Sequence, residues 1–328
     1  ELSLKVPGNN AVNYKLHPDK LENSYFDYEW RSDNKLPITV FHKVEERDSC
    51  MRLTVQLTAA QDVYFNYRQL LSTGYRHDNC QFYMPGFWYR RNLRSPKKAP
   101  SFHTSDSWLV REDRLSAPLT GIFSEKEKRF MTVNRLDDFS MDALATHKEG
   151  EIILSGKTSL GFTGFENQQG IAMLSFGFPY REAPKSYIRK LTLAPEVEAF
   201  QLMKKGESVL LTWEIMESGA DDFSDFIQHT WEHCYDTYAP KPVENSYSIA
   251  DMKQVLSCFF VNSLVDNQPL VYNSGIHLKV SDCERNGQAE VGFIGRVLLN
   301  AFNAWEYGWQ SNREELKVNR SEERRVGK

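Results

Sequence analysis

The feature that most constrains this chain is a change in hydrophobic period near residue 219. Before it, apolar residues alternate with polar ones, as at Met51, Leu53, Val55 and Leu57. A period of two places such residues on one face of a β-strand. After it, apolar residues recur every three or four positions, which lines one side of a helix. The sequence therefore predicts a β domain followed by an α-helical one.

The β part is predicted to be a large antiparallel sandwich over residues 37–217. Alternating stretches recur at 51–57, 63–67, 151–154, 171–178, 196–203 and 209–215. No helical stretch of useful length separates them, which argues against a βαβ fold. Gly206 suits the tight turn of a hairpin. We expect residues 1–36 to be irregular, because Pro7, Gly8 and Pro18 interrupt any period.

The helical part is predicted to contain three helices. The first covers residues 223–238 and stops before Pro240 and Pro242. The others cover about 248–265 and 291–309, separated by a loop. A single helical hairpin cannot bury both of its faces, so we expect further helices beyond it.

Composition excludes several classes of function. No apolar run approaches the length of a membrane span. The net charge is −4 and the basic residues gather in one segment, which argues against nucleic-acid binding. No glycine-rich phosphate loop follows a strand, so no nucleotide cofactor is expected. The five cysteines are widely spaced, so we expect neither a disulfide scaffold nor a metal site. The sequence leaves the oligomeric state open.

Residues 320–328 resemble the translation of a short-read sequencing adapter. We expect them not to derive from the protein, and we expect the protein itself to continue beyond Asn319. The expected organisation is a β-sandwich domain at 1–217, a linker helix and a truncated helical hairpin at 218–319, and this tail.

Two stretches carry a resemblance to a known family. Residues 222–242 form a helix ending in Tyr-Ala-Pro-Lys-Pro, and residues 290–301 read Glu-Val-Gly-Phe-Ile-Gly-Arg-Val-Leu-Leu-Asn-Ala. Together with the order of sandwich then hairpins, they resemble the six-hairpin glycosidase-like enzymes, in particular uncharacterised gut-bacterial members. The resemblance implies an N-terminal super-sandwich joined to an (α/α)6 toroid, polysaccharide-degrading activity, and a periplasmic or secreted location. It also implies that the principal catalytic carboxylates lie in toroid helices beyond this chain.

The segment 82–118 is the first candidate for contact with substrate. It holds seven basic residues against three acidic ones. Aromatic faces stack on sugar rings, and arginine binds carboxylate or sulfate through two parallel hydrogen bonds. The substrate-binding candidates are Trp88, Tyr89, Arg90, Arg91, Trp108, Arg111 and Arg114. We expect this segment to form one wall of a cleft for a uronic-acid polymer. The alternative is that its arginines neutralise the acidic helical domain while its aromatics pack beneath the loop.

The second candidate is the stretch 277–296. Its catalytic candidates are His277, Asp282, Glu284 and Glu290. Glycoside hydrolysis needs two carboxyl groups at a fixed distance, whereas a lyase needs a base and a group that neutralises the uronate, which His277 and Arg285 could supply. The alternative for the acids is a solvated loop and a charge at a helix N-terminus, and for His277 a structural histidine.

These observations favour a glycoside hydrolase acting on an anionic polysaccharide, with this fragment itself inactive. The alternatives are a polysaccharide lyase and a non-catalytic module that binds glycan or supports the helical domain.

Overall fold

The computed structural model describes residues 1–20, 27–32, 35–48, 50–137, 142–144, 148–189, 191–242, 244, 246–262, 264–265, 271–272, 276–278, 283–285 and 296–317. These residues fall into two compact units, Glu1–Pro240 and Lys241–Lys328. We describe each unit by itself.

The first unit is a sandwich of two sheets. Within the described residues, one sheet runs in the order β10 (Trp108–Arg111), β14 (Phe162–Gln168), β15 (Ile171–Phe178), β7 (Val63–Arg76), β1 (Leu2–Lys5) and β2 (Val12–Tyr14), with β19 (Val197–Met203) also pairing with β7. Two short strands, β13 (Gly150–Ile153) and β16 (Arg181–Glu182), extend this sheet beside β19. The prediction of an antiparallel sandwich is confirmed for these strands, apart from the parallel pair β13–β19.

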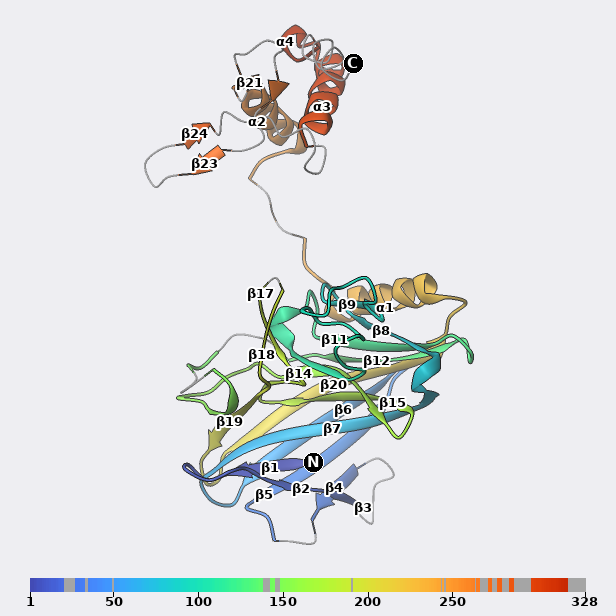
Figure 1. Ribbon diagram of the computed structural model, residues 1–328, viewed down its shortest axis with the longest axis vertical. Coiled ribbons are helices and arrows are strands. Elements are labelled where there is room, and N and C mark those ends of the chain that lie inside the picture. The colour runs from blue at the N-terminus through green and yellow to red at the C-terminus, as the bar shows by residue number, and fades with distance from the viewer. Residues whose placement is uncertain are drawn as a thin grey trace. The chain divides into compact units, whose positions relative to one another are not determined.

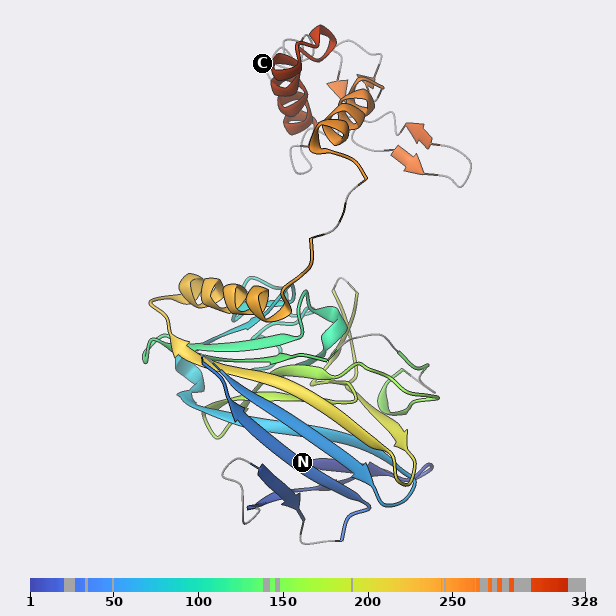
Figure 2. The same ribbon diagram turned by 180° about the vertical axis from the view of Figure 1, so that it is seen from behind.

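The second sheet lies against the first. Its order is β3 (His17–Lys20), β4 (Asp27–Arg31), β5 (Ile38–Glu46), β6 (Met51–Ala59), β20 (Ser208–Gly219), β12 (Arg129–Arg135), β11 (Leu119–Ser124), β8 (Cys80–Met84) and β9 (Trp88–Arg90). Strands β7 and β15 face the viewer in Figure 1, and the second sheet comes to the front in Figure 2. Alternation sets the register: in β6, Leu53, Val55, Leu57 and Ala59 are all buried in the core between the sheets.

Two sequence predictions are corrected here. Residues 1–36 are not irregular throughout, because they contain β1 to β4, which are short and join the edges of both sheets. The segment 82–118 is not one long connection, because β8, β9 and β10 lie within it. The turn at Gly206, with φ of +81°, is as expected.

Helix α1 (Phe223–Tyr238) packs on the outer face of the second sheet. Asp222 caps it by accepting hydrogen bonds from the backbone N–H groups of Ser224 and Asp225. Phe226 is fully buried against Phe123 and Phe130. This helix therefore belongs to the first unit, whereas we expected it to begin the helical part.

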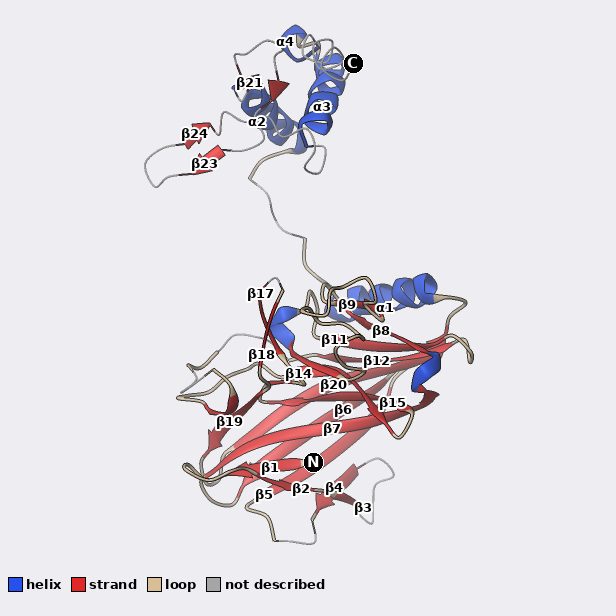
Figure 3. Ribbon diagram, in the orientation of Figure 1, coloured by secondary structure: helices blue, strands red, loops and turns tan. Residues whose placement is uncertain are grey.

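The second unit contains α2 (Ile249–Asn262), α3 (Arg296–Ser311) and the short α4 (Glu314–Lys317). Two small hairpins accompany them, formed by β21 (Leu264–Val265) with β22 (Val271–Tyr272) and by β23 (Ile276–Leu278) with β24 (Cys283–Arg285). Helices and strands are distinguished by colour in Figure 3. Helices α2 and α3 correspond to the helices predicted at about 248–265 and 291–309, although α2 already ends at Asn262. A complete toroid stays an expectation.

Candidate functional site

A cleft of about 580 Å³ opens on the sandwich unit, and we call it the arginine cleft. It is lined by Gly86, Phe87, Arg111, Asp113, Arg114 and Tyr187. These residues come from the β8–β9 turn, the end of β10 with the helical turn that follows it, and the hairpin β17 (Ser186–Arg189) with β18 (Thr192–Ala194). The rings of Phe87 and Tyr187 meet edge to face, with centroids 6.1 Å apart. The cleft thus combines aromatic rings with two guanidinium groups.

Arg111 is held in place by acids on two sides. Its Nε and Nη2 donate to the two carboxylate oxygens of Asp113, at 3.0 and 2.8 Å. Nη2 also donates to Asp142 at 3.1 Å. The guanidinium lies over the ring of Tyr180, 4.3 Å from its centroid. Burial alone would lower the pKa of Arg111, but hydrogen bonding to Asp113 and the nearby charges raise it above its ordinary value.

Arg114 is anchored in a similar way by Glu182 of β16. Its Nη2 donates to Oε2 of Glu182 at 3.1 Å, and its Nε also donates to that carboxylate. Glu182 is almost fully buried and accepts a further hydrogen bond from Ser186 at the start of β17. The ion pair therefore ties the helical turn after β10 to the hairpin that carries Tyr187.

Each of the two arginines has one nitrogen that donates no hydrogen bond to a described residue. Among the described residues, the hydrogen bonds of Arg111 and Arg114 use Nε and Nη2 and leave Nη1 of each without a partner. Their side chains are 20% and 28% exposed. A guanidinium already fixed on one edge loses little conformational freedom when its remaining N–H groups bind an anion. Each arginine is thus paired with at least one carboxylate and has its Nη1 left as a hydrogen-bond donor.

Trp88 and Trp108 do not line the arginine cleft. Both side chains are fully buried in the core, where their rings lie 5.9 Å apart. A ring without exposed area cannot stack on a sugar, so our prediction for these two residues is wrong. For them the alternative holds, in which the aromatics pack beneath the segment.

Arg91 also has a structural role. Its guanidinium donates to the backbone carbonyl oxygens of Cys80, at 3.2 Å, and of His77 and Asp78. It lies over the ring of Phe102 at 5.0 Å. These bonds fix the chain that follows β9 against the start of β8, so the guanidinium of Arg91 is poorly placed to bind a substrate.

The neighbouring residues form an exposed basic strip, which we define as Arg90, Arg94, Lys97 and Lys98. All four are exposed, and the sequence from 89 to 105 contains no acidic residue. Arg90 lies over the ring of Phe223 in α1, 4.8 Å from its centroid. Arg94, Lys97 and Lys98 form no ion pair with any described residue. Tyr89, which is 51% exposed, adds an accessible ring beside the strip.

The structure does not test the catalytic candidates. His277 lies opposite Glu284 in the backbone register of β23 and β24. Asp282 and Glu290 lie outside the described residues. The catalytic role of all four stays a prediction.

Sequence reasoning missed Tyr187 and Glu182. Tyr187 lies in a hairpin far along the chain from residues 86–114, and no local pattern links the two stretches. Glu182 belongs to a strand of two residues, too short to show a period.

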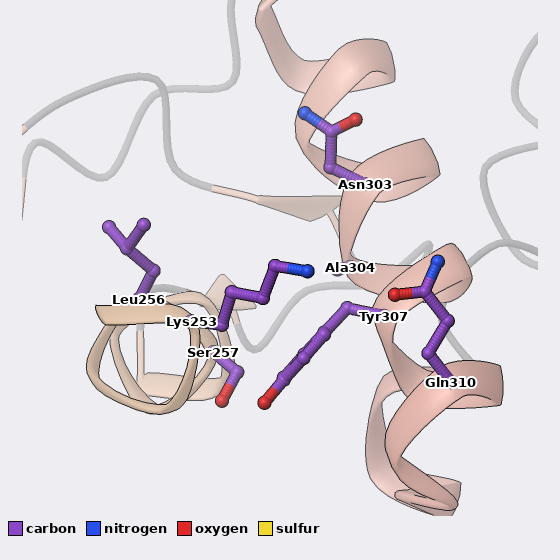
Figure 4. Close-up of a pocket in the computed structure, with 7 residues that line it drawn as sticks. All are labelled: Lys253, Leu256, Ser257, Asn303, Ala304, Tyr307 and Gln310. Atoms are coloured by element: carbon purple, nitrogen blue, oxygen red, sulfur yellow. The ribbon is translucent and has the colours of Figure 1, made fainter. Parts of the chain in front are cut away.

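A second hollow, of about 250 Å³, lies between α2 and α3 in the second unit. Figure 4 shows Lys253 extending from α2 toward α3, and the hydroxyl of Tyr307 beside Ser257. Its other lining residues are Leu256, Asn303, Ala304 and Gln310. The described lining provides no carboxylate pair, which glycoside hydrolysis needs.

Within the part of the chain that the structure describes, we find no helix long and apolar enough to cross a membrane.

Comparison with known proteins shows no family for this chain. No family model matches the chain, and no curated protein matches its sequence. Solved structures that align with part of this chain include a polysaccharide lyase, with 12% identity over 70% of this chain and 27% of that one at a TM-score of 0.33. A GH36 α-galactosidase from Geobacillus stearothermophilus aligns with 9% identity over 67% of this chain and 30% of the galactosidase chain, at a TM-score of 0.36. The Slr1438 protein from Synechocystis sp. PCC 6803 aligns with 7% identity over 66% of this chain and 73% of the Slr1438 chain, at a TM-score of 0.32. The chain spans less than a third of the length of the first two.

Proposed function

We propose that this chain is the sandwich-bearing part of a carbohydrate-active enzyme and that it binds an anionic polysaccharide. The observation that carries the proposal is the arginine cleft, where Arg111 and Arg114 lie beside Phe87 and Tyr187. An aromatic ring offers a face to the C–H side of a sugar, and an anchored guanidinium offers its remaining Nη1 donor to the sugar carboxylate. A uronic-acid polymer satisfies both features.

The basic strip supports the same ligand class in a different way. Its exposed cations are spread along one segment and are not fixed by carboxylates, so they attract a polyanion without selecting one sugar unit. The cleft would then recognise a single uronate, and the strip would hold the chain that extends from it.

The reaction type is a further step of the proposal. The preferred reading is a glycoside hydrolase of the six-hairpin type, whose toroid would supply the two carboxyl groups. A lyase is the alternative, and His277 with Arg285 would then act as base and charge neutraliser. The two are separated by their products, because a lyase leaves an unsaturated uronate that absorbs ultraviolet light and a hydrolase does not.

A binding experiment tests the ligand class. The 328-residue chain is titrated with a uronate oligosaccharide and with its carboxyl-reduced, neutral counterpart. Arg111→Ala removes a charge-assisted hydrogen bond worth about 1.5–3 kcal/mol and should weaken uronate binding by roughly 10- to 150-fold. Binding of the neutral sugar should change far less. An equal loss for both sugars, together with a lower melting temperature, would show that Arg111 only maintains the fold.

The strip is tested by a pair of matched double variants. Lys97→Ala with Lys98→Ala removes two exposed charges from the strip, whereas Lys204→Ala with Lys205→Ala removes two from the exposed β19–β20 turn. The first pair should weaken binding of a long uronate polymer by about 3- to 10-fold at low salt, because exposed ion pairs are each worth a fraction of a kcal/mol. The second pair should leave binding unchanged. Equal effects of the two pairs would mean that polymer binding depends on the net charge of the chain and not on the basic strip.

If neither sugar binds, the site proposal fails, and the sandwich would be a structural support.

A further inference from the structure

Three residues with metal-ligating side chains meet between the second sheet and α1. Cys50 immediately precedes β6, Glu214 lies in β20, and His233 lies in α1. Their ligand atoms, a sulfur, a carboxylate oxygen and an imidazole nitrogen, all lie within 4.8 Å of one another. The residues are far apart in the sequence, and the register of β6 with β20 brings the first two together, since Arg52 pairs with Glu214.

The spacing is close to that of ligands around one ion. His233 Nε2 and Glu214 Oε2 are 3.4 Å apart. Two ligands at about 2.0–2.1 Å from a tetrahedral zinc ion are themselves separated by roughly 3.3 Å. The Cys50 sulfur lies within 4.8 Å of both atoms and would have to lie at roughly 3.6 Å from each to complete three sides of such a site, with water in the fourth position.

The surroundings hold the carboxylate in place. Arg52 Nη2 donates to Glu214 Oε1 at 2.6 Å, and Thr237 Oγ1 donates to Oε2 at 3.1 Å. The side chain of Glu214 is 5% exposed and that of His233 is 17% exposed, while Cys50 is half-buried and leaves a route from solvent. Hydrogen bonds from residues outside the ligand set, such as these, orient metal ligands and tune the affinity of the site for its metal.

The ligand types select the metal. Thiolate and imidazole together favour zinc over magnesium or calcium, which prefer oxygen ligands.

We propose that Cys50, Glu214 and His233 form a zinc-binding site that fastens α1 to the second sheet. The competing interpretation is that Glu214, Arg52, His233 and Thr237 are simply a hydrogen-bonded network that holds the helix, with Cys50 nearby. In that case the network is complete without an ion, and zinc should bind no better here than at other exposed histidines.

The test is zinc titration of the chelator-treated 328-residue chain. We expect one zinc ion per chain and a rise in melting temperature on binding. Because loss of an outer partner alone weakens metal sites by about 10- to 100-fold, Cys50→Ser and His233→Gln should each weaken binding by more than about 100-fold. Cobalt(II) should give a thiolate charge-transfer absorption that Cys50→Ser abolishes.

Two variants serve as matched controls. His229 lies one turn before His233 on α1 and is 43% exposed, and Cys258 is an exposed cysteine of the second unit. His229→Gln and Cys258→Ser should bind zinc as the unaltered chain does. Circular dichroism without zinc shows whether each variant folds. A folded His233→Gln variant that keeps its affinity, or an unaltered chain that binds no stoichiometric zinc, would overturn the proposal.

Discussion

Glu112 and Arg135 form an ion pair inside the sandwich. Arg135 Nη1 donates to Glu112 Oε2 at 2.8 Å, and the backbone N–H of Gly161 donates to the same oxygen at 2.7 Å. Both side chains are nearly or fully buried, and Glu112 Oε1 has no partner among the described residues. Burial raises the pKa of Glu112 to about 7, against the opposing effect of Arg135.

That shift predicts how stability depends on pH. The folded chain holds a proton on Glu112 that the unfolded chain has already released, so the stabilising contribution is complete below about pH 4.5 and is lost as pH rises through about 7. The free energy of unfolding, measured relative to Glu112→Gln, should fall by about 3 kcal/mol across that window. Denaturant titrations of both proteins at several pH values provide the measurement. A difference that grows with pH would show that Arg135 outweighs burial.

At the residue scale the sequence shows which chemical groups are present but not which way they face. Arg91 and Arg111 are alike in the composition of segment 82–118, yet one donates to backbone carbonyls and the other lines the cleft. Trp88 lies next to Tyr89, and only the tyrosine is exposed, because neighbours in a strand point to opposite faces. Assigning these roles requires the register of β8, β9 and β10, which strands of three to five residues do not reveal.

At the scale of elements, long regular stretches are predictable and short ones are not. Strands β6 and β15 and helix α1 show clear periods over many residues, and their predicted positions agree with the structure, whereas β7 begins as predicted but continues well past residue 67 to Arg76. Strands β1 to β4 are three to five residues long; β1 pairs with the distant β7, and the others pair with neighbouring strands. Their stability comes from the sheet rather than from local sequence.

Helix α1 begins at a cap that can be tested by substitution. Asp222 accepts two backbone hydrogen bonds, and its own pKa is lowered by those bonds to Asp225 and Ser224. Asp222→Ala should cost about 1 kcal/mol of stability in denaturant unfolding. Asp221→Ala, which removes the adjacent carboxylate, should have a much smaller effect because no cap bond is lost. Equal losses would indicate that general charge near the helix N-terminus, and not the cap, is responsible.

At the scale of the whole molecule, the boundary after Pro240 separates two units with different surfaces. The first unit encloses its core between two sheets and α1. The second unit leaves apolar side chains exposed on both of its long helices. These are Ile249, Met252, Val255 and Leu256 on α2, and Phe302 and Trp309 on α3. Their exposure agrees with the expectation from the sequence that one helical hairpin cannot bury both of its faces.

This contrast predicts different behaviour for the two parts in solution. The chain of residues 1–328 should bind a hydrophobic dye and self-associate at high concentration, because contiguous exposed apolar patches promote both. Residues 1–240 should remain monomeric, bind little dye and unfold cooperatively, because the sandwich core and α1 are complete within them. Dye fluorescence and light scattering at matched concentrations provide the measurement, and Val255→Lys with Leu256→Lys in the longer chain should reduce both signals. Dye binding by residues 1–240 equal to that of the longer chain would contradict the assignment, because the exposed apolar surface would then lie on the sandwich.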